Sequence, residues 1–108
     1  MILYGIPTCD TCKTALKALK AAGHEVTFRD LRAQPLTAAE WAPFVAEFGT
    51  RLINKTSPSY RSFSDYLKES EAEAQLLANP TVMKRPLVAE GAKMTLGWDP
   101  AAQAVWGL

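Results

Sequence analysis

The chain has 108 residues, a formal net charge of +1 and a hydrophobic fraction of 48%, enough for one ordinary domain with a real core. Its 12 basic and 11 acidic residues are interspersed, so the basic surface of a protein that binds nucleic acid or a membrane directly is missing. No apolar run reaches the roughly 18 residues that span a bilayer, and the N-terminus does not resemble a signal peptide. We therefore expect a cytoplasmic protein. Separately, we expect it to be a monomer.

The first predicted element is a short apolar strand, residues 1–4, which is followed by a turn and by a helix that opens at Cys9. Apolar residues then recur at helical spacing, and Gly23 is the expected stop of the helix. Residues 24–30 alternate between apolar and polar and predict a second strand. Strand, helix and strand together form a βαβ unit.

Cys9 and Cys12 form a Cys-x-x-Cys pair at the start of this helix. Free backbone N–H groups and the positive end of the helix dipole favour an anion there, and such positions lower a thiol pKa from about 8.5 to roughly 3.5–7.5. We therefore predict Cys9 as the nucleophile and Cys12, one turn further on, as the resolving thiol. Thr8 and Lys13 flank the pair as candidate substrate-binding residues. The charge of Lys13 would lower the Cys9 pKa, whereas Asp10 would raise it.

Other interpretations of these residues remain open. Free cysteines are often buried, so both could be core residues, above all Cys12, which lies on the apolar face of the helix. A structural zinc site usually needs four ligands, and the chain has only two cysteines and His24, so we expect no metal. We interpret His24 as a solvated loop residue, because it lies at the end of the helix remote from Cys9. In a reducing compartment the cysteine pair is expected to be catalytic or redox-sensing rather than a structural disulfide.

A helical insertion, about residues 37–79, follows the second strand. Thr37 and Glu40 predict a capping box for a helix that runs to Gly49. Pro43 lies beyond the first turn, where proline is tolerated, so we expect a kink or a late start. The apolar positions of this helix indicate core packing rather than a cofactor site.

Residues 51–59 are rich in turn formers and predict a loop on the substrate side of the protein. A short helix is expected over residues 60–67. A second one should begin with a capping box of Ser70 and Glu73 and end at Asn79.

The last part of the chain predicts a β-hairpin with a turn at Glu90–Gly91, followed by a helix with Asp99 as its N-cap and Pro100 in its first position. The order βαβ, helices, hairpin and helix, with Cys-x-x-Cys after the first strand, predicts an α/β thioredoxin-like fold. We expect a four-stranded mixed sheet in a single domain over residues 1–108.

Motifs along nearly the whole chain resemble the arsenate reductase (ArsC)/Spx family, and the short length is similar to its small YffB-like branch. In order, they are Tyr-Gly-Ile-x-x-Cys-x-x-Cys-Lys at 4–13, Pro-Leu-Thr at 35–37, Leu-Ile-Asn-Lys-Thr-Ser-Pro-Ser-Tyr-Arg at 52–61, Lys-Arg-Pro-Leu at 84–87 and Leu-Gly-Trp at 96–98.

The resemblance implies a nucleophilic first cysteine, which is Cys9, and an arginine before a cis proline, which corresponds to Arg85 and Pro86. Arg85 would pair with an oxyanion or a glutathione carboxylate and help to hold Cys9 as a thiolate. Lys55 or Arg61 would replace further anion-binding arginines of the arsenate reductases.

The chain departs from the arsenate reductase pattern where it has Asn54, Lys55 and Thr56, and again at Trp98 and Asp99. An aspartate near the anion site would repel arsenate. The resemblance therefore implies a glutathione-dependent thiol-disulfide reductase without a bound cofactor, reduced by glutathione or by a glutaredoxin- or thioredoxin-type donor. The alternatives are an Spx-like redox-switched regulator that binds the RNA polymerase alpha subunit, and arsenate reductase proper.

Overall fold

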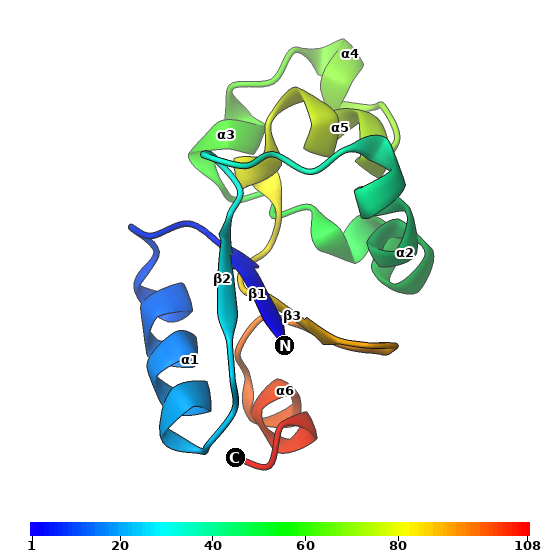
Figure 1. Cartoon of the computed structure of the whole chain (residues 1–108). Coiled ribbons are helices and arrows are strands. Elements are labelled where there is room, and N and C mark those ends of the chain that lie inside the picture. Colours follow the sequence, from blue (N-terminus) through cyan, green and yellow to red (C-terminus); the bar gives the residue numbers. More distant parts are fainter. The chain divides into compact units, whose positions relative to one another are not determined.

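A computed structural model describes all residues from Met1 to Leu108, and Figure 1 follows their order along the chain. The chain divides into two compact units. The first consists of Met1–Asp30 and Arg85–Leu108, and the second is Leu31–Lys84. None of the helices is both long enough and apolar enough to cross a lipid bilayer.

The first unit contains the predicted four-stranded mixed sheet, in the order β2-β1-β3-β4. Strand β1 pairs in parallel with β2 and antiparallel with β3, and β3 and β4 form the antiparallel hairpin. The elements of this unit are β1 (Ile2–Gly5), α1 (Asp10–Ala21), β2 (Thr27–Asp30), β3 (Leu87–Glu90), β4 (Lys93–Leu96) and α6 (Pro100–Val105).

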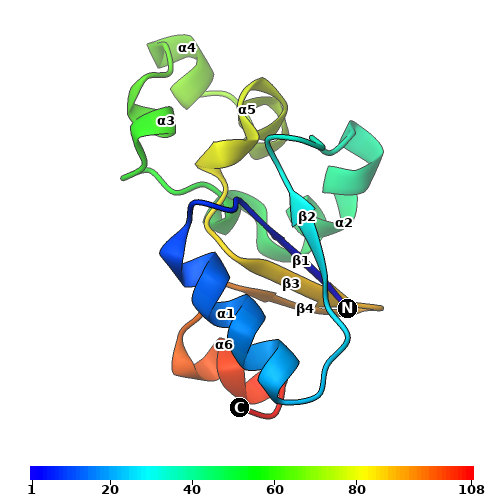
Figure 2. The same ribbon diagram turned by 60° about the vertical axis from the view of Figure 1, so that its left-hand side comes forward.

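Helices α1 and α6 cover the same face of this sheet (Figure 2). Leu3 of β1 and Val88 of β3 are partners in the register, so their side chains lie on one face. The core on that face consists of Leu3, Cys12, Ala15, Leu19, Val88 and Trp106. The indole N–H of Trp106 donates to the Thr95 hydroxyl at 2.8 Å, so this buried polar group has a partner.

The structure corrects our interpretation of His24 as a solvated residue. Its side chain is half-buried, and Nε2–H donates to the Trp106 carbonyl at 2.9 Å. The sequence could not show this contact, because the two residues are 82 positions apart in the chain. His24 therefore ties the loop after α1 to the end of α6.

The second unit is helical and contains α2 (Ala38–Phe48), the 3₁₀ helix η1 (Gly49–Leu52), α3 (Pro58–Arg61), α4 (Asp65–Lys68), α5 (Ala72–Ala78) and the 3₁₀ helix η2 (Pro80–Val82). The capping box is confirmed: the Thr37 hydroxyl accepts from the Glu40 N–H at 3.2 Å, and the Glu40 carboxylate accepts from the Thr37 N–H at 3.0 Å. Helix α2 begins directly after this box, so the expected late start at Pro43 is wrong. Pro43 and Ala39 are both exposed, so water can reach the Ala39 carbonyl that Pro43 leaves without an N–H donor.

The helix predicted over residues 60–67 is wrong, because the structure has two separate single turns there, α3 and α4. The Ser57 hydroxyl accepts from the Tyr60 N–H, and the Ser64 hydroxyl accepts from the Leu67 N–H, each at 3.2 Å. Ser64 is thus the N-cap of a separate helix, α4, at a position where the sequence predicted the middle of one continuous helix.

The predicted capping box of Ser70 and Glu73 is also wrong. Helix α5 has Glu71 at its N-cap, with no side-chain capping hydrogen bond. The Ser70 hydroxyl instead donates to the Tyr66 carbonyl at 2.8 Å, in the preceding helix. The predicted end is confirmed, because α5 stops at Ala78 and Asn79 is its C-cap.

Candidate active site

Cys9 is the N-cap residue of α1, with extended backbone angles of φ −83° and ψ 117°. Its N–H donates to the Ile6 carbonyl, and its carbonyl accepts from the Lys13 N–H, each at 3.1 Å. The predicted position of Cys9 at the start of the helix is therefore confirmed. The Cys9 side chain is half-buried, so part of it is open to solvent.

The pKa of the Cys9 thiol is lower than its ordinary value. Partial burial acts to raise this pKa, but the backbone N–H and thiol of Cys12 and the hydrogen bond and charge of the Arg85 guanidinium lower it by more. The positive charge that lowers this pKa comes from Arg85, as the resemblance implied, whereas Lys13, which was predicted to act in the same direction, does not contribute. At neutral pH a larger share of Cys9 is thiolate than in an ordinary cysteine.

Cys12 has a contrasting environment. Its side chain is fully buried in the core on the sheet, and this burial, together with the neighbouring Cys9, raises the pKa of its thiol to about 12. The backbone N–H of Ile6 and the charge of Arg85 act in the lowering direction but do not offset the burial. Both thiols are free. At neutral pH Cys12 is therefore a protonated thiol that can donate a hydrogen bond to the Cys9 sulfur.

Gly5, at the end of β1, makes room for the Cys12 side chain. A Cβ atom at this position would lie 2.5 Å from Cys12 Sγ and 3.3 Å from Cys12 Cβ. Real Cβ contacts are not this short, so only glycine fits. The sequence does not show this role of Gly5, because the role depends on how α1 packs against β1.

We expect Gly5→Ala to destabilise the protein by about 1–3 kcal/mol, the usual cost of overpacking a core. The free energy of unfolding from urea titration monitored by tryptophan fluorescence measures this loss. The double variant Gly5→Ala/Cys12→Ala is the matched control, because removing the sulfur removes the shortest contact. Adding Cys12→Ala should therefore cost less in the Gly5→Ala background than in the wild type. Equal stability of Gly5→Ala and wild type would contradict the assigned role.

Arg85 reaches the cysteine pair because of the strand order. Strands β1 and β3 are antiparallel neighbours with Tyr4 opposite Leu87, so the end of β1 that leads to Cys9 lies beside the start of β3. Arg85 and Pro86 immediately precede β3, and the peptide bond between them is cis, as the resemblance implies. Arg85 is half-buried and Pro86 is fully buried. A pairing between distant strands thus brings a cation to the N-terminus of α1.

The structure places the other predicted site residues in different surroundings. Thr8 is exposed in the turn before Cys9. Lys13 lines a hollow of about 210 Å³ together with Pro7, Leu16 and Phe28. Lys55 and Arg61 belong to the second unit, where Arg61 is the last residue of α3. The structure thus brings Cys9, Cys12 and Arg85 together within the first unit, and Pro86 follows Arg85 in the chain. No group of three or more His, Cys, Asp or Glu side chains is arranged to hold a metal ion.

The sequence model of the ArsC family matches residues 4–104. This chain belongs to the ArsC family. The match includes both cysteines, Arg85 and Pro86, and confirms the resemblance that the motifs indicated.

Individual relatives agree with this assignment. An uncharacterized protein of Haemophilus influenzae is 33% identical over 102 residues, which cover 90% of each chain. The solved structure of the YffB (PA3664) protein is similar with a TM-score of 0.83 and 28% identity over 95% of each chain. An arsenate reductase (ArsC) related protein from Brucella melitensis has a TM-score of 0.74 and 29% identity, over 99% of this chain and 94% of that one. The fold is therefore the thioredoxin-like fold of the ArsC family.

Proposed function

We propose that this ArsC-family protein is a glutathione-dependent thiol-disulfide reductase with Cys9 as its nucleophile. The observation that carries the proposal is the lowered pKa of a half-buried thiol at a helix N-terminus, beside the guanidinium of Arg85. A thiolate at neutral pH attacks disulfides, whereas a thiol does not.

In the first step the Cys9 thiolate attacks one sulfur of a substrate disulfide. The substrate S–S bond breaks, a Cys9–substrate mixed disulfide forms, and the departing thiolate takes a proton from solvent. The cation of Arg85 stabilises the Cys9 thiolate before the attack and would bind an anionic group of the substrate.

In the second step Cys12 attacks the Cys9 sulfur, releases the second substrate thiol and leaves a Cys9–Cys12 disulfide. The pKa of Cys12 is raised first by burial and then by the hydrogen bond and charge of Cys9. The mixed disulfide removes the Cys9 charge while the charge of Arg85 remains, so the first step itself makes Cys12 easier to ionise. Two molecules of glutathione then reduce the disulfide and become one molecule of glutathione disulfide, which balances the reaction.

The direct test is a turnover assay with glutathione and a small disulfide, in which glutathione disulfide is measured by coupled consumption of NADPH. We expect saturable turnover above the uncatalysed rate. A parallel assay with arsenate should show none, because the resemblance puts Asn54, Lys55 and Thr56, and Trp98 and Asp99, in the segments where arsenate reductases have further arginines. A different result would favour the Spx-like alternative. In that case neither substrate is turned over, and the RNA polymerase alpha subunit binds the oxidised form of the protein but not the reduced form.

We expect Arg85→Ala to raise the pKa of Cys9, because it removes both a hydrogen bond and a positive charge from the sulfur. It should also weaken the apparent affinity for glutathione by about 1.5–3 kcal/mol, the range for a hydrogen bond to a charged group. The absorbance of the thiolate at 240 nm against pH gives the pKa in a Cys12→Ala background, and steady-state kinetics give the affinity.

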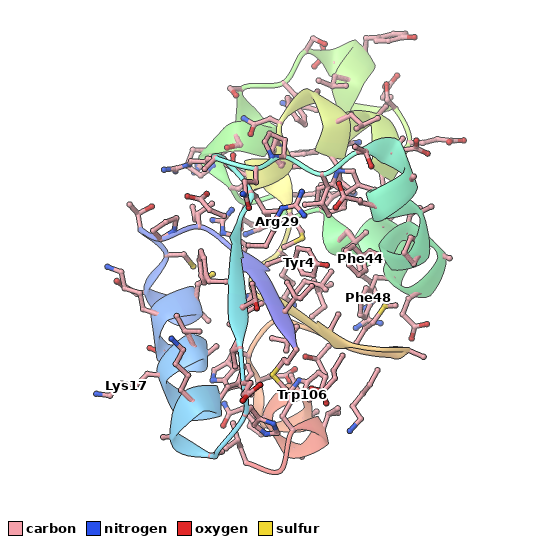
Figure 3. The ribbon with its side chains drawn as sticks, viewed as in Figure 1. Tyr4, Lys17, Arg29, Phe44, Phe48 and Trp106 are labelled. Carbon is pink, nitrogen blue, oxygen red and sulfur yellow. The ribbon has the colours of Figure 1, made fainter.

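Lys17→Ala is the matched control for Arg85→Ala, since Lys17 is an exposed cation of α1 that projects away from the sheet (Figure 3). Lys17→Ala should change neither the pKa of Cys9 nor the apparent affinity for glutathione. An Arg85→Ala protein with the wild-type titration and kinetics would show that Arg85 has no part in the site.

A further inference from the structure

The second unit contains a basic pocket, which we define as the hollow of about 430 Å³ lined by Arg51, Ile53, Asn54, Lys55 and Lys84. Three of these five residues are cations, and none is acidic. The charged residues of the whole chain nearly balance, with a net charge of +1. The positive charge of the basic pocket is therefore local, because the protein as a whole is almost neutral.

Backbone pairing holds the two segments of the basic pocket together. Ile53 and Met83 form an isolated antiparallel bridge. On either side of it, the Asn54 N–H donates to the Val82 carbonyl at 2.8 Å, and the Lys84 N–H donates to the Leu52 carbonyl at 2.7 Å. These bonds bring Lys84 next to a segment about 30 positions earlier in the chain. The cations are thus gathered by the fold of this unit.

The cations of the basic pocket are not neutralised by the protein. None of Arg51, Lys55 and Lys84 forms an ion pair. The Arg51 guanidinium lies 5.5 Å from the centre of the Phe48 ring, and this contact restricts its orientation without cancelling its charge. Like charges that line one hollow repel one another, and a bound anion would relieve that repulsion.

The polar and apolar parts of the lining also suit a small ligand. The Asn54 carboxamide oxygen accepts from the N–H of Thr56 at 3.1 Å and from its hydroxyl at 2.7 Å, which leaves the NH₂ group of Asn54 as a donor. Ile53 is 9% exposed and contributes an apolar wall. The volume lies within the roughly 300–1,000 Å³ of small-molecule sites.

We propose that the basic pocket binds a small polyvalent oxyanion, that is, a small molecule with phosphate groups or with several carboxylates. The fork of a guanidinium binds two oxygens of such a group, and the ammonium groups of Lys55 and Lys84 add point charges. Lys55 was predicted as a substrate-binding residue, whereas Arg51 and Lys84 were missed. This proposal does not depend on the reductase activity proposed above.

The test is isothermal titration of the full-length protein with pyrophosphate and, separately, with citrate, at constant ionic strength. We expect one saturable site with a Kd below about 1 mM for at least one of these anions. Tighter binding of pyrophosphate would assign the pocket to phosphate-bearing ligands, and tighter binding of citrate would assign it to polycarboxylates. Arg51→Gln and Lys84→Gln should each weaken binding about tenfold or more, since each removes a charge-assisted hydrogen bond.

Lys17→Gln is the control for general charge effects, because it removes the same charge from the exposed side of α1, outside the basic pocket. It should leave the Kd unchanged. The proposal is overturned if neither anion saturates, or if Lys17→Gln weakens binding as much as Lys84→Gln. Lys84 is exposed, so its variant should keep the wild-type thermal unfolding. If Arg51→Gln unfolds, Lys84→Gln and Lys55→Gln still decide the question.

Discussion

Iodoacetamide should alkylate Cys9 at least about 100 times faster than Cys12 at pH 8. The pKa of Cys12 is raised to about 12, so only about one Cys12 in ten thousand is a thiolate at that pH. The side chain is also fully buried, which restricts the reagent. Cys9 is half-buried with a pKa below its ordinary value, so it offers an accessible thiolate. Mass spectrometry of the digested protein measures the two rates separately.

Two further observations make this labelling experiment decisive. In guanidinium chloride the two cysteines should react at similar rates, because unfolding removes both the burial of Cys12 and the effect of Arg85 on Cys9. In the folded protein the Cys9 rate should rise with pH to a midpoint below that of the denatured protein. Equal rates in the folded protein, or faster labelling of Cys12, would show that the assignment of nucleophile and buried thiol is wrong.

Cys9→Ser should lower turnover with glutathione and a disulfide by at least about a thousandfold, or about 4 kcal/mol in activation free energy. The serine hydroxyl does not ionise near neutral pH and cannot form the mixed disulfide, so the covalent step is lost. Cys12→Ala should have a smaller effect, because Cys9 can still react and glutathione can still attack the mixed disulfide. The coupled assay measures both variants, and intact mass measures the trapped Cys9–substrate adduct.

The comparison between the two variants also tests the role of Cys12. If Cys12 is the resolving thiol, the Cys12→Ala protein should accumulate the mixed disulfide, and mild oxidation of the wild type should give an intramolecular bond with a loss of two hydrogens. Full turnover by Cys12→Ala without an accumulated adduct would mean that Cys12 is only a core residue. Unfolding of each variant must be measured beside the assay, because Cys12→Ala also removes a fully buried sulfur from the core. Retained turnover in Cys9→Ser would exclude Cys9 as the nucleophile.

The sequence by itself determined those features that depend on a few neighbouring residues. Cys9 at the start of a helix, the capping box of Thr37 and Glu40, and Asp99 before Pro100 were all predicted and are all present. In each case the hydrogen-bonding groups are within four positions of one another, so the local sequence contains the whole interaction. The mixed sheet was also predicted from the sequence, because the order of strand and helix patterns along the chain restricts how the strands can pair.

Predictions from neighbouring residues were wrong where a polar side chain had a second possible hydrogen-bond partner. Ser70 and Glu73 have the spacing of a capping box, but the Ser70 hydroxyl is bound to the Tyr66 carbonyl of the preceding helix. His24 looked solvated until the fold placed the Trp106 carbonyl beside it. A pattern of residue types does not show which of two available partners a polar group will take.

Only the tertiary structure decided how the site works. The pairing of β1 with β3 brings Arg85 to Cys9, and the packing of α1 on β1 buries Cys12 and requires Gly5. The bridge between Ile53 and Met83 likewise assembles the basic pocket from distant segments. Burial and long-range pairing determine the charges and the dielectric around a thiol, and these in turn determine its pKa. The residue pattern could therefore name the nucleophile, and the family resemblance could name Arg85, but only the fold shows that the Arg85 guanidinium acts on the Cys9 sulfur.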